Sequence, residues 1–121
     1  MKGVIIIFED NCVREALIIN VHDGDTFDAE VNLGFDVKRK IRIRLSRINA
    51  PEVFGVEKFQ GLVSKTFVED NFLNKKVQVI DKGLDTFRRT LAEVYVNFNE
   101  SQTNLSDLLV TRNFAIYETF K

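Results

Sequence analysis

The chain has 121 residues, of which 45% are hydrophobic and 29% are charged, and its formal net charge is −1 at pH 7. This size and composition predict one globular domain over residues 1–121, with a core that needs no disulfide or metal staple. The small net charge excludes a general attraction to polyanions, so any binding of nucleic acid would depend on a local cluster of cations.

The first half of the chain has the pattern of β-strands. A β-branched run at residues 4–8 predicts an N-terminal strand within an extension over residues 1–12, and residues 13–21 predict a second strand. Asp23-Gly24 is a hairpin signal, because glycine adopts positive φ without strain, and residues 27–33 then alternate as a half-buried strand. A turn at residues 34–36 leads into a strand at 41–45, which completes an antiparallel meander of three strands.

The second half mixes helices with strands. Apolar residues at helical spacing predict an amphipathic helix over residues 57–73, which ends at Asn74 and covers the meander. Strands are predicted at 77–81 and 92–98, joined by a polar connection over 82–89. Asn104 is a good N-cap and Asn113 suits a left-handed helix end, so residues 105–112 are predicted to form a second helix. The phenylalanines at core-facing spacings are predicted to be buried, namely Phe27, Phe59, Phe67, Phe72 and Phe98.

The predicted order is β-β-β-α-β-β-α. This order predicts a β-barrel with helices, the OB-fold. In this fold five strands form a Greek-key barrel, and one helix lies between the third and fourth strands. Closure of the barrel is an inference, because a sequence pattern shows strands but not their pairing.

Residues 41–52 carry a strand into a proline turn that ends on Glu52. Successive strand side chains point to opposite faces, so Arg42 and Arg44 are predicted to point away from the core. On a regular strand Asn49 would lie about 16 Å beyond Arg44. A site that uses both residues therefore requires a bend near Ser46 and Arg47.

Charged groups recur at predicted turns, where packing does not require them and where function concentrates. They are Asp23, Asp25, Arg44, Glu52, Asp85 and Arg89. Asp23 is expected to bond to the backbone as a turn residue, and His22 to be structural or on the surface. Asp85 is either a solvated loop residue or part of the site. The basic run at 38–40, with Arg42, Arg44 and Arg47, is either a solvated strand face or a surface that follows phosphates.

At these positions the chain resembles the staphylococcal nuclease family, roughly over residues 17–118. Residues 23–26 match the D-G-D-T motif of the family, and residues 44–52 match R-L-x-x-[IV]-[DN]-[TA]-P-E. Residues 55–59 resemble G-V-E-K-Y, residues 81–83 match D-K-G and residues 89–92 match R-[GT]-L-A. Motifs in this order with compatible spacing are specific, whereas D-G-D-T alone would be weak.

The resemblance implies a Ca²⁺-dependent phosphodiesterase that cleaves DNA and RNA with little sequence preference and leaves 3′-phosphates. The metal ligands of the family match Asp25, Asn49 and the carbonyl of Ala50. The catalytic positions match Glu52, as the base that activates water, and the phosphate-gripping pair Arg44 and Arg89. Contacts with substrate are expected from Asp85, Phe87 and Arg42.

The chemistry of phosphodiester hydrolysis supports the same assignment. The reaction needs activated water and neutralisation of charge on the phosphorus. A hard divalent cation with oxygen ligands supplies both, and the arginine fork donates two hydrogen bonds to phosphate.

The chain departs from the family pattern in a few places. Asn49 stands where the family often has Asp, which predicts weaker metal binding because affinity follows ligand charge. Phe87 replaces an aromatic hydroxyl, Arg88 replaces a small residue, and Thr119 and Lys121 stand where tyrosines flank the substrate. The loop over residues 51–55 is also shorter than in the staphylococcal enzyme.

Two other functions are open to a chain of this kind. One is a catalytically weak or inactive OB module that binds nucleic acid or a protein partner, and the other is a purely structural interaction domain. The retained Asp25, Glu52 and both arginines favour the nuclease. No leader and no stretch of roughly 20 apolar residues is visible, so the sequence predicts a cytoplasmic monomer without membrane partners, serving nucleic-acid turnover in a cell or during phage growth.

Overall fold

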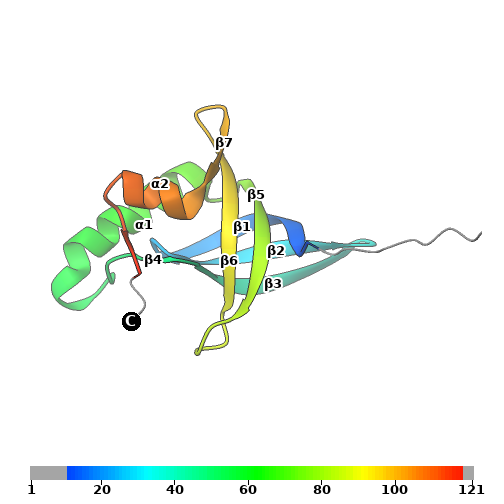
Figure 1. The fold of residues 1–121 in the computed structure, drawn as a ribbon, viewed down its shortest axis with the longest axis horizontal. Helices are drawn as coiled ribbons and strands as arrows, with labels where there is room; N and C mark the ends of the chain where they lie inside the picture. The colour runs from blue at the N-terminus through cyan, green and yellow to red at the C-terminus, as the bar shows by residue number, and fades with distance from the viewer. Residues whose placement is uncertain (1–10, 119–121) are drawn as a thin grey trace, which may run out of the picture.

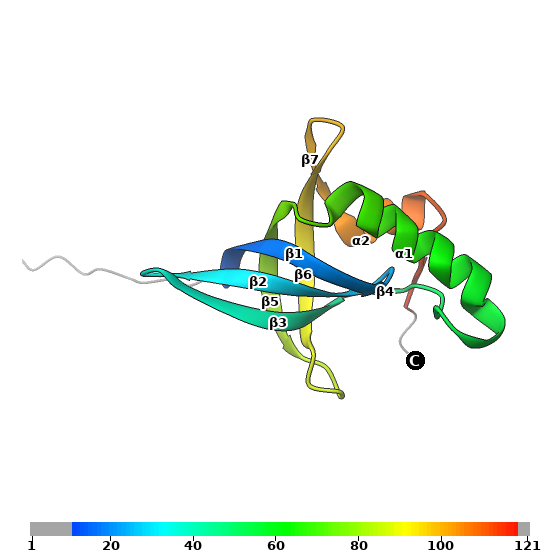
Figure 2. The same cartoon turned by 180° about the vertical axis from the view of Figure 1, so that it is seen from behind.

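The computed structural model describes residues 11–118, and the strand predicted at residues 4–8 lies outside this range. Helices α1 and α2 lie together at one end of the molecule, and the β2–β3 hairpin extends from the opposite end (Figure 1 and Figure 2). None of the helices within residues 11–118 has the length and apolar character needed to cross a membrane.

Five strands form the barrel. β1 (Val13–Asp23), β2 (Thr26–Gly34) and β3 (Val37–Leu45) form the predicted antiparallel meander, and β5 (Lys76–Leu84) pairs with β1. β6 (Thr90–Phe98) pairs antiparallel with β5 and parallel with β3, which closes the barrel. The structure therefore confirms the predicted five-stranded barrel of OB type with two helices.

Three short strands were not predicted. β7 (Ser101–Asn104) extends the sheet beyond β6, and β4 (Ile48–Asn49) pairs with β8 (Ile116–Tyr117) near the C-terminal end of the described chain. Strands of two residues have no recognisable alternation, so only the pairing of distant segments reveals them. The β4–β8 pair brings the last described residues to the loop that carries Asn49.

The helices follow the predicted capping signals. α1 (Lys58–Phe72), preceded by the 3₁₀ turn η1 (Gly55–Glu57), ends just before Asn74, as predicted, and Asn74 has a positive φ of 63°. α2 (Leu105–Thr111) begins where the side chain of Asn104 accepts a hydrogen bond from the amide of Asp107 at 3.1 Å. Asn113 has a φ of 64° after the end of α2. Local hydrogen bonding and backbone preference explain why these ends were predictable.

Phenylalanines fill the space between the helices and the barrel. Phe27 and Phe72 are among the largest fully buried side chains, as predicted. The ring of Phe67 stacks on Phe114 with a centroid distance of 4.5 Å and packs edge-on or tilted against Phe72 and Phe98. Such pairs are favourable beyond the area that they bury, so this cluster helps to fix α1 on the barrel.

The prediction that Phe59 belongs to the core is wrong, because 77% of its surface is exposed. The face of α1 that is buried consists of Gly61, Ser64, Val68 and Phe72. The first half of α1 approaches the barrel so closely that only small residues fit. An ideal Cβ at Gly61 would lie 1.9 Å from the carbonyl oxygen of Glu52, and one at Gly24 would lie 2.8 Å from Cβ of Ser64. The larger apolar residues in this half of α1 therefore face outward.

Candidate active site

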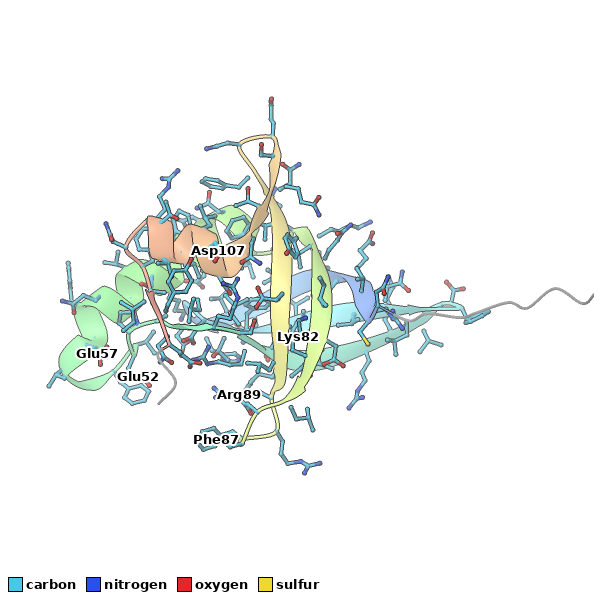
Figure 3. All side chains as sticks on the ribbon, in the orientation of Figure 1. Glu52, Glu57, Lys82, Phe87, Arg89 and Asp107 are labelled. Atoms are coloured by element: carbon cyan, nitrogen blue, oxygen red, sulfur yellow. The ribbon has the colours of Figure 1, made fainter. Side chains whose placement is uncertain are left out.

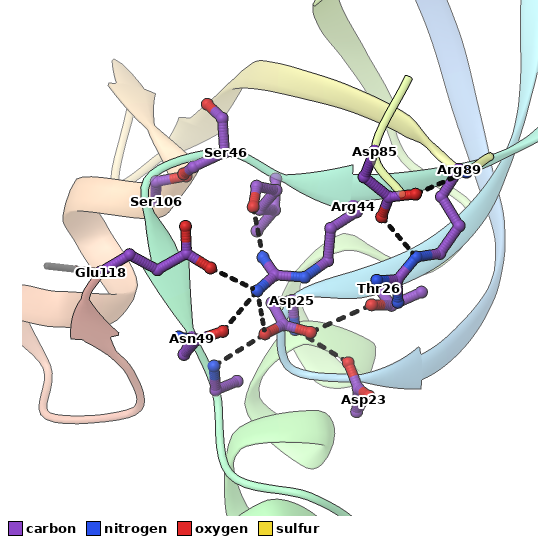
Figure 4. A network of polar contacts seen from close by, with 12 residues as sticks. Asp23, Asp25, Thr26, Arg44, Ser46, Asn49, Asp85, Arg89, Ser106 and Glu118 are labelled. Carbon is purple, nitrogen blue, oxygen red and sulfur yellow. Dashed lines mark hydrogen bonds and ion pairs between the residues drawn. The ribbon is translucent and has the colours of Figure 1, made fainter. Parts of the chain in front are cut away.

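The site begins at a sharp bend after β3, as the sequence required. Arg47 has a φ of 71° and separates the end of β3 at Leu45 from the start of β4. The hydroxyl of Ser106 on α2 donates to the carbonyl of Ser46 at 2.9 Å and anchors the bend. The chain folds back far enough for Nη2 of Arg44 to donate to Oδ1 of Asn49 at 2.6 Å (Figure 4).

Arg44 is buried rather than directed to solvent, which corrects the prediction from strand alternation. Only 10% of its side chain is exposed. Nη1 donates to the carbonyl of Leu45, and besides Asn49, Nη2 contacts Oε1 of Glu118 at 3.1 Å and Oδ2 of Asp25 at 3.5 Å (Figure 4). A buried charge is stable only when it is paired and hydrogen-bonded. Arg44 therefore forms the centre of a polar cluster and does not belong to an exposed basic patch.

Asp25 links the β1–β2 turn to the loop after β4. Its Oδ1 accepts a hydrogen bond from the hydroxyl of Thr26 at 3.0 Å, and its Oδ2 accepts one from the amide of Ala50 at 2.7 Å. Asp23 accepts a hydrogen bond from the amide of Asp25 at 3.2 Å, which confirms the predicted turn role. Burial, together with the adjacent Asp25 carboxylate, raises the pKa of Asp23 to about 7. The two acids thus occupy a site where a second negative charge is unfavourable unless a cation is near.

Asp85 shapes the turn between β5 and β6 and holds Arg89. Its Oδ1 accepts hydrogen bonds from the amides of Phe87 and Arg89, both at 2.9 Å, and its Oδ2 accepts one from Nε of Arg89 at 2.7 Å. Burial alone would raise the pKa of Asp85, but these hydrogen bonds outweigh it and lower the pKa below its ordinary value. The alternative of a solvated loop residue is therefore wrong, because Asp85 is bonded throughout its carboxylate.

The geometry of this turn leaves Arg89 available to a ligand. Among residues 11–118 its ion pair is with Asp85 through Nε, so the terminal nitrogens Nη1 and Nη2 can bind another acceptor. The guanidinium carbon lies 5.3 Å from the ring centroid of Phe87, an arrangement in which the aromatic face attracts the cation. Arg89 is therefore oriented from two sides before any ligand binds.

Arg42 is held at the same side of the barrel. It lies opposite Asp28 in the β2–β3 register, and its Nε donates to Oδ1 of this buried acid at 3.0 Å. His22 Nε2 forms a hydrogen bond with the other oxygen of Asp28 at 2.9 Å. Burial acts to raise the pKa of Asp28, but Arg42 and His22 outweigh burial and lower it. His22 thus has the structural role that was expected, as a partner of Asp28.

Glu52 lies between two depressions in the surface. It is exposed on the loop before α1, and Figure 3 shows it together with Phe87 and Arg89 of the β5–β6 turn. The arginine-lined depression measures about 700 Å³ and contains Glu52 with Lys40, Arg42, Phe87, Arg88 and Arg89. The apolar depression measures about 550 Å³ and contains Glu52 with Asn49, Ala50 and residues of α1 and 113–116. The structure thus places the candidate base, Arg89, Arg42 and Phe87 around one hollow.

Arg47 is not part of a surface that follows phosphates. It donates to both carboxylate oxygens of Glu93 at 2.7 and 3.0 Å, to Asp107 at 2.9 Å and to the side chain of Asn104 at 3.2 Å. The Arg47 guanidinium also lowers the pKa of Asp107 below its ordinary value, despite partial burial. These contacts tie the bend after β3 to α2, so the role of Arg47 is to hold the bend.

Glu118 is a site residue that sequence reasoning missed. It contacts Arg44 because β8 pairs with β4 and because the amide of Glu118 donates to the carbonyl of Arg47 at 2.8 Å. No motif covered Glu118, and a contact across such a separation in sequence leaves no local signal. Only the pairing of β4 with β8 could have indicated it.

The oxygen donors near Asp25 match a hard cation in chemical type. Asp25 supplies a carboxylate, Asn49 an amide oxygen and Ala50 a backbone carbonyl, which are ligands that Ca²⁺ accepts. Within residues 11–118 no group of three or more His, Cys, Asp or Glu side chains is arranged to hold a metal. Oxygens of both Asp25 and Asn49 face Nη2 of Arg44. The donors therefore fit Ca²⁺ in kind, with fewer anionic side chains than a dedicated acidic cluster.

Comparisons with known proteins identify the family of the chain. The model of the family described as staphylococcal nuclease homologue matches residues 42–121. The chain is 35% identical over 96 residues to the micrococcal nuclease of Shigella flexneri, which covers 75% of this chain and 49% of that protein. It is 34% identical over 87 residues to an uncharacterized endonuclease of Haemophilus influenzae, covering 69% of this chain and 45% of that protein. The chain thus spans about half the length of these curated relatives.

A solved structure agrees at the level of the fold. The extended Tudor domain TD3 of mouse TDRD1, solved in complex with a MILI peptide containing dimethylarginine, superposes with a TM-score of 0.67 at 7% identity. The match covers 98% of this chain and 100% of that one. At this identity the likeness establishes the fold alone. The family match includes Arg44, Glu52 and Arg89 and covers well over half of the chain. The chain therefore belongs to the staphylococcal nuclease family.

Proposed function

We propose that this chain is a nuclease domain that hydrolyses phosphodiester bonds in DNA and RNA and leaves 3′-phosphates. The observation that carries the proposal is that Glu52, Arg42 and Arg89 line one open depression. A carboxylate is a general base, and arginines neutralise the charge that develops on a phosphate under attack. Both nuclease relatives support the same reaction class.

Arg89 binds the scissile phosphate in this proposal. Asp85 holds its Nε and Phe87 faces its guanidinium, so the two terminal nitrogens are presented as a fork without loss of side-chain freedom on binding. Arg42, fixed by Asp28, adds a second positive charge to the same hollow. The substrate phosphate is therefore drawn to the side of Glu52 that faces the arginines.

Glu52 accepts the proton of the attacking water. Its exposure on the loop before α1 allows water to reach it, and the missing side chain of Gly61 lets α1 pack directly against the backbone of this loop. A carboxylate in this position, close to but not paired with the phosphate-binding arginines, can take a proton as the water attacks phosphorus. The reaction forms one P–O bond to the water oxygen and breaks the P–O bond to the 5′ oxygen of the next nucleoside, which takes up a proton from solvent and leaves as a hydroxyl.

Arg44 and the donors around Asp25 form the other part of the proposed machinery. Asp25, Asn49 and the carbonyl of Ala50 would hold Ca²⁺, which supplies Lewis-acid charge when bound. Arg44 keeps its charge in a buried position beside them and is oriented by Asn49 and Glu118. It would reach a phosphate oxygen by exchanging its contact with Glu118.

Incubation of the pure chain with single-stranded DNA tests this function. We expect cleavage with Ca²⁺ and none with a chelator, and we expect Glu52→Gln to lower the rate by about 10²-fold or more. Glu69→Gln, which removes a carboxylate of α1 outside both depressions, is the matched control. Binding of DNA without cleavage, unchanged by Glu52→Gln, would instead identify a binding module.

A further inference from the structure

The apolar depression on the other side of Glu52 shares Asn49, Ala50 and Glu52 with the proposed chemistry, but its remaining residues have no part in it. The first half of α1 and residues 113–116 form its walls, and the loop over residues 49–52 forms its edge. Phe59 and Val63 come from α1, and Phe114 and Ile116 come from the segment that leads into β8. Its volume of about 550 Å³ is within the range of sites that hold small organic groups.

The large apolar side chains in its lining include solvent-exposed ones from both walls, beside polar residues such as Gln60 and Asn113. Phe59 is 77% exposed and Ile116 is 69% exposed, although both belong to residue types that are normally covered. The close approach of α1 through Gly61 and Ser64 places Phe59 on the open side of the helix. Exposed apolar side chains gathered around a concave surface indicate a binding site rather than a solvated face.

The charges of the two depressions are opposite. The arginine-lined depression contains the cations Lys40, Arg42, Arg88 and Arg89, which outnumber its acids Asp28 and Glu52. The lining of the apolar depression contains the acids Glu52 and Glu57 and no lysine or arginine. A phosphate therefore favours the first hollow and is repelled from the second, whereas an uncharged aromatic group suits the second.

We propose that the apolar depression binds an unpaired nucleobase, with the base stacked on Phe59. The inference rests on the proposed function, because it needs a substrate strand with a phosphate at Glu52. Glu52 lines both hollows, so they adjoin, and a strand held by Arg89 on one side can place a neighbouring nucleotide toward Phe59 on the other. A base that stacks on Phe59 within this hollow has left its partner strand, so the proposed site takes unpaired nucleotides. Stacking on an aromatic ring is tolerant of base identity.

Binding of single-stranded oligonucleotides to variants tests this site. In a Glu52→Gln background, which prevents turnover, Phe59→Ala should weaken binding about tenfold in fluorescence anisotropy, and Phe59→Trp should retain binding. Phe54→Ala is the matched control, because Phe54, which comes just before η1, is 68% exposed but does not line the depression. An oligonucleotide lacking the base next to the bound phosphate should remove the difference between Phe59→Ala and its parent.

Two results would overturn the proposal. One is equal binding by Phe59→Ala and Phe54→Ala, and the other is a dimer in sedimentation that Phe59→Ala dissociates, which would assign the surface to a second copy of the chain. Cleavage by the unmodified protein separates the two proposals. If the protein cleaves but Phe59 has no effect, the base site fails alone; if it binds through Phe59 without cleaving, the nuclease proposal fails alone.

Discussion

Gly61 on α1 lies against the backbone of Glu52. A Cβ atom added to Gly61 would lie only 1.9 Å from the carbonyl oxygen and 2.4 Å from the carbonyl carbon of Glu52. The helix that covers the barrel is thus also the support for the candidate base. A glycine inside a helix is usually unfavourable by roughly 1 kcal/mol relative to alanine. Here the close approach of helix and loop explains its presence.

Gly61→Ala should therefore destabilise the protein, although alanine has a higher helix propensity than glycine. The added methyl meets backbone rather than a flexible side chain, so either the Glu52 loop or α1 must move. We expect a lower melting temperature and at least a tenfold loss of nuclease activity, since a displacement of about 1 Å near reacting groups can cost 10²-fold. Lys65→Ala on the same helix is the control, and a more stable, fully active Gly61→Ala protein would contradict this account.

Arg44→Lys and Arg89→Lys should each lower the rate of DNA cleavage by about 10²-fold or more, the scale of losing one charge-stabilising group. Lysine keeps the charge but not the fork that bonds Asn49 and Glu118 from Arg44, or Asp85 from Arg89. Steady-state kinetics at saturating Ca²⁺ measures the effect, with Arg39→Lys on β3 as the control. Rates near that of the unmodified protein would exclude either arginine from the site.

Asn49→Asp should tighten Ca²⁺ binding, because a carboxylate replaces an amide oxygen next to Asp25 and affinity rises with ligand charge. Isothermal titration with Ca²⁺ in the absence of nucleic acid measures this directly. Asn97→Asp, on an exposed position of β6, adds the same charge away from the site. An affinity no higher than that of the Asn97→Asp control would contradict the view that the amide of Asn49 weakens metal binding.

The Asp85 carboxylate should make the stability of the protein depend on pH. The pKa of Asp85 is lower in the folded state than in the unfolded state, where it is about 3.9. The stabilisation of the fold by Asp85 is therefore complete above the unfolded pKa and is lost as the pH falls through the folded pKa. Urea unfolding should show that Asp85→Asn is less stable than the unmodified protein at pH 7, with the difference shrinking below about pH 4. Asp70→Asn on the exposed side of α1 controls for the lost charge. A stability difference between Asp85→Asn and the unmodified protein that grows toward acid pH would contradict the prediction.

Much of this fold could be predicted because its signals are local. Alternation identified the meander, Asn104 and Asn113 marked the ends of α2, and the geometry of residues 41–52 required the bend that Arg47 makes. Asp23 bonds to the next turn residues as its type suggests. Each of these features depends on a few neighbouring residues, whose hydrogen bonds and dihedral preferences are set by their own side chains.

The burial of Arg44 and the exposure of Phe59 were decided only by the tertiary structure, through contacts between distant segments. Strand parity directed Arg44 outward, yet Asp25, Asn49 and Glu118 cover it, since the bend and the β4–β8 pair fold over that face. Helical periodicity placed Phe59 in the core, yet Gly61 brings α1 so close to the Glu52 loop that the small face is buried. Sequence determined the longer strands, the helices and the residue types for the chemistry. The short strands, and the side of each element that is covered, depended on how closely distant backbones approach, and no local pattern encodes that distance.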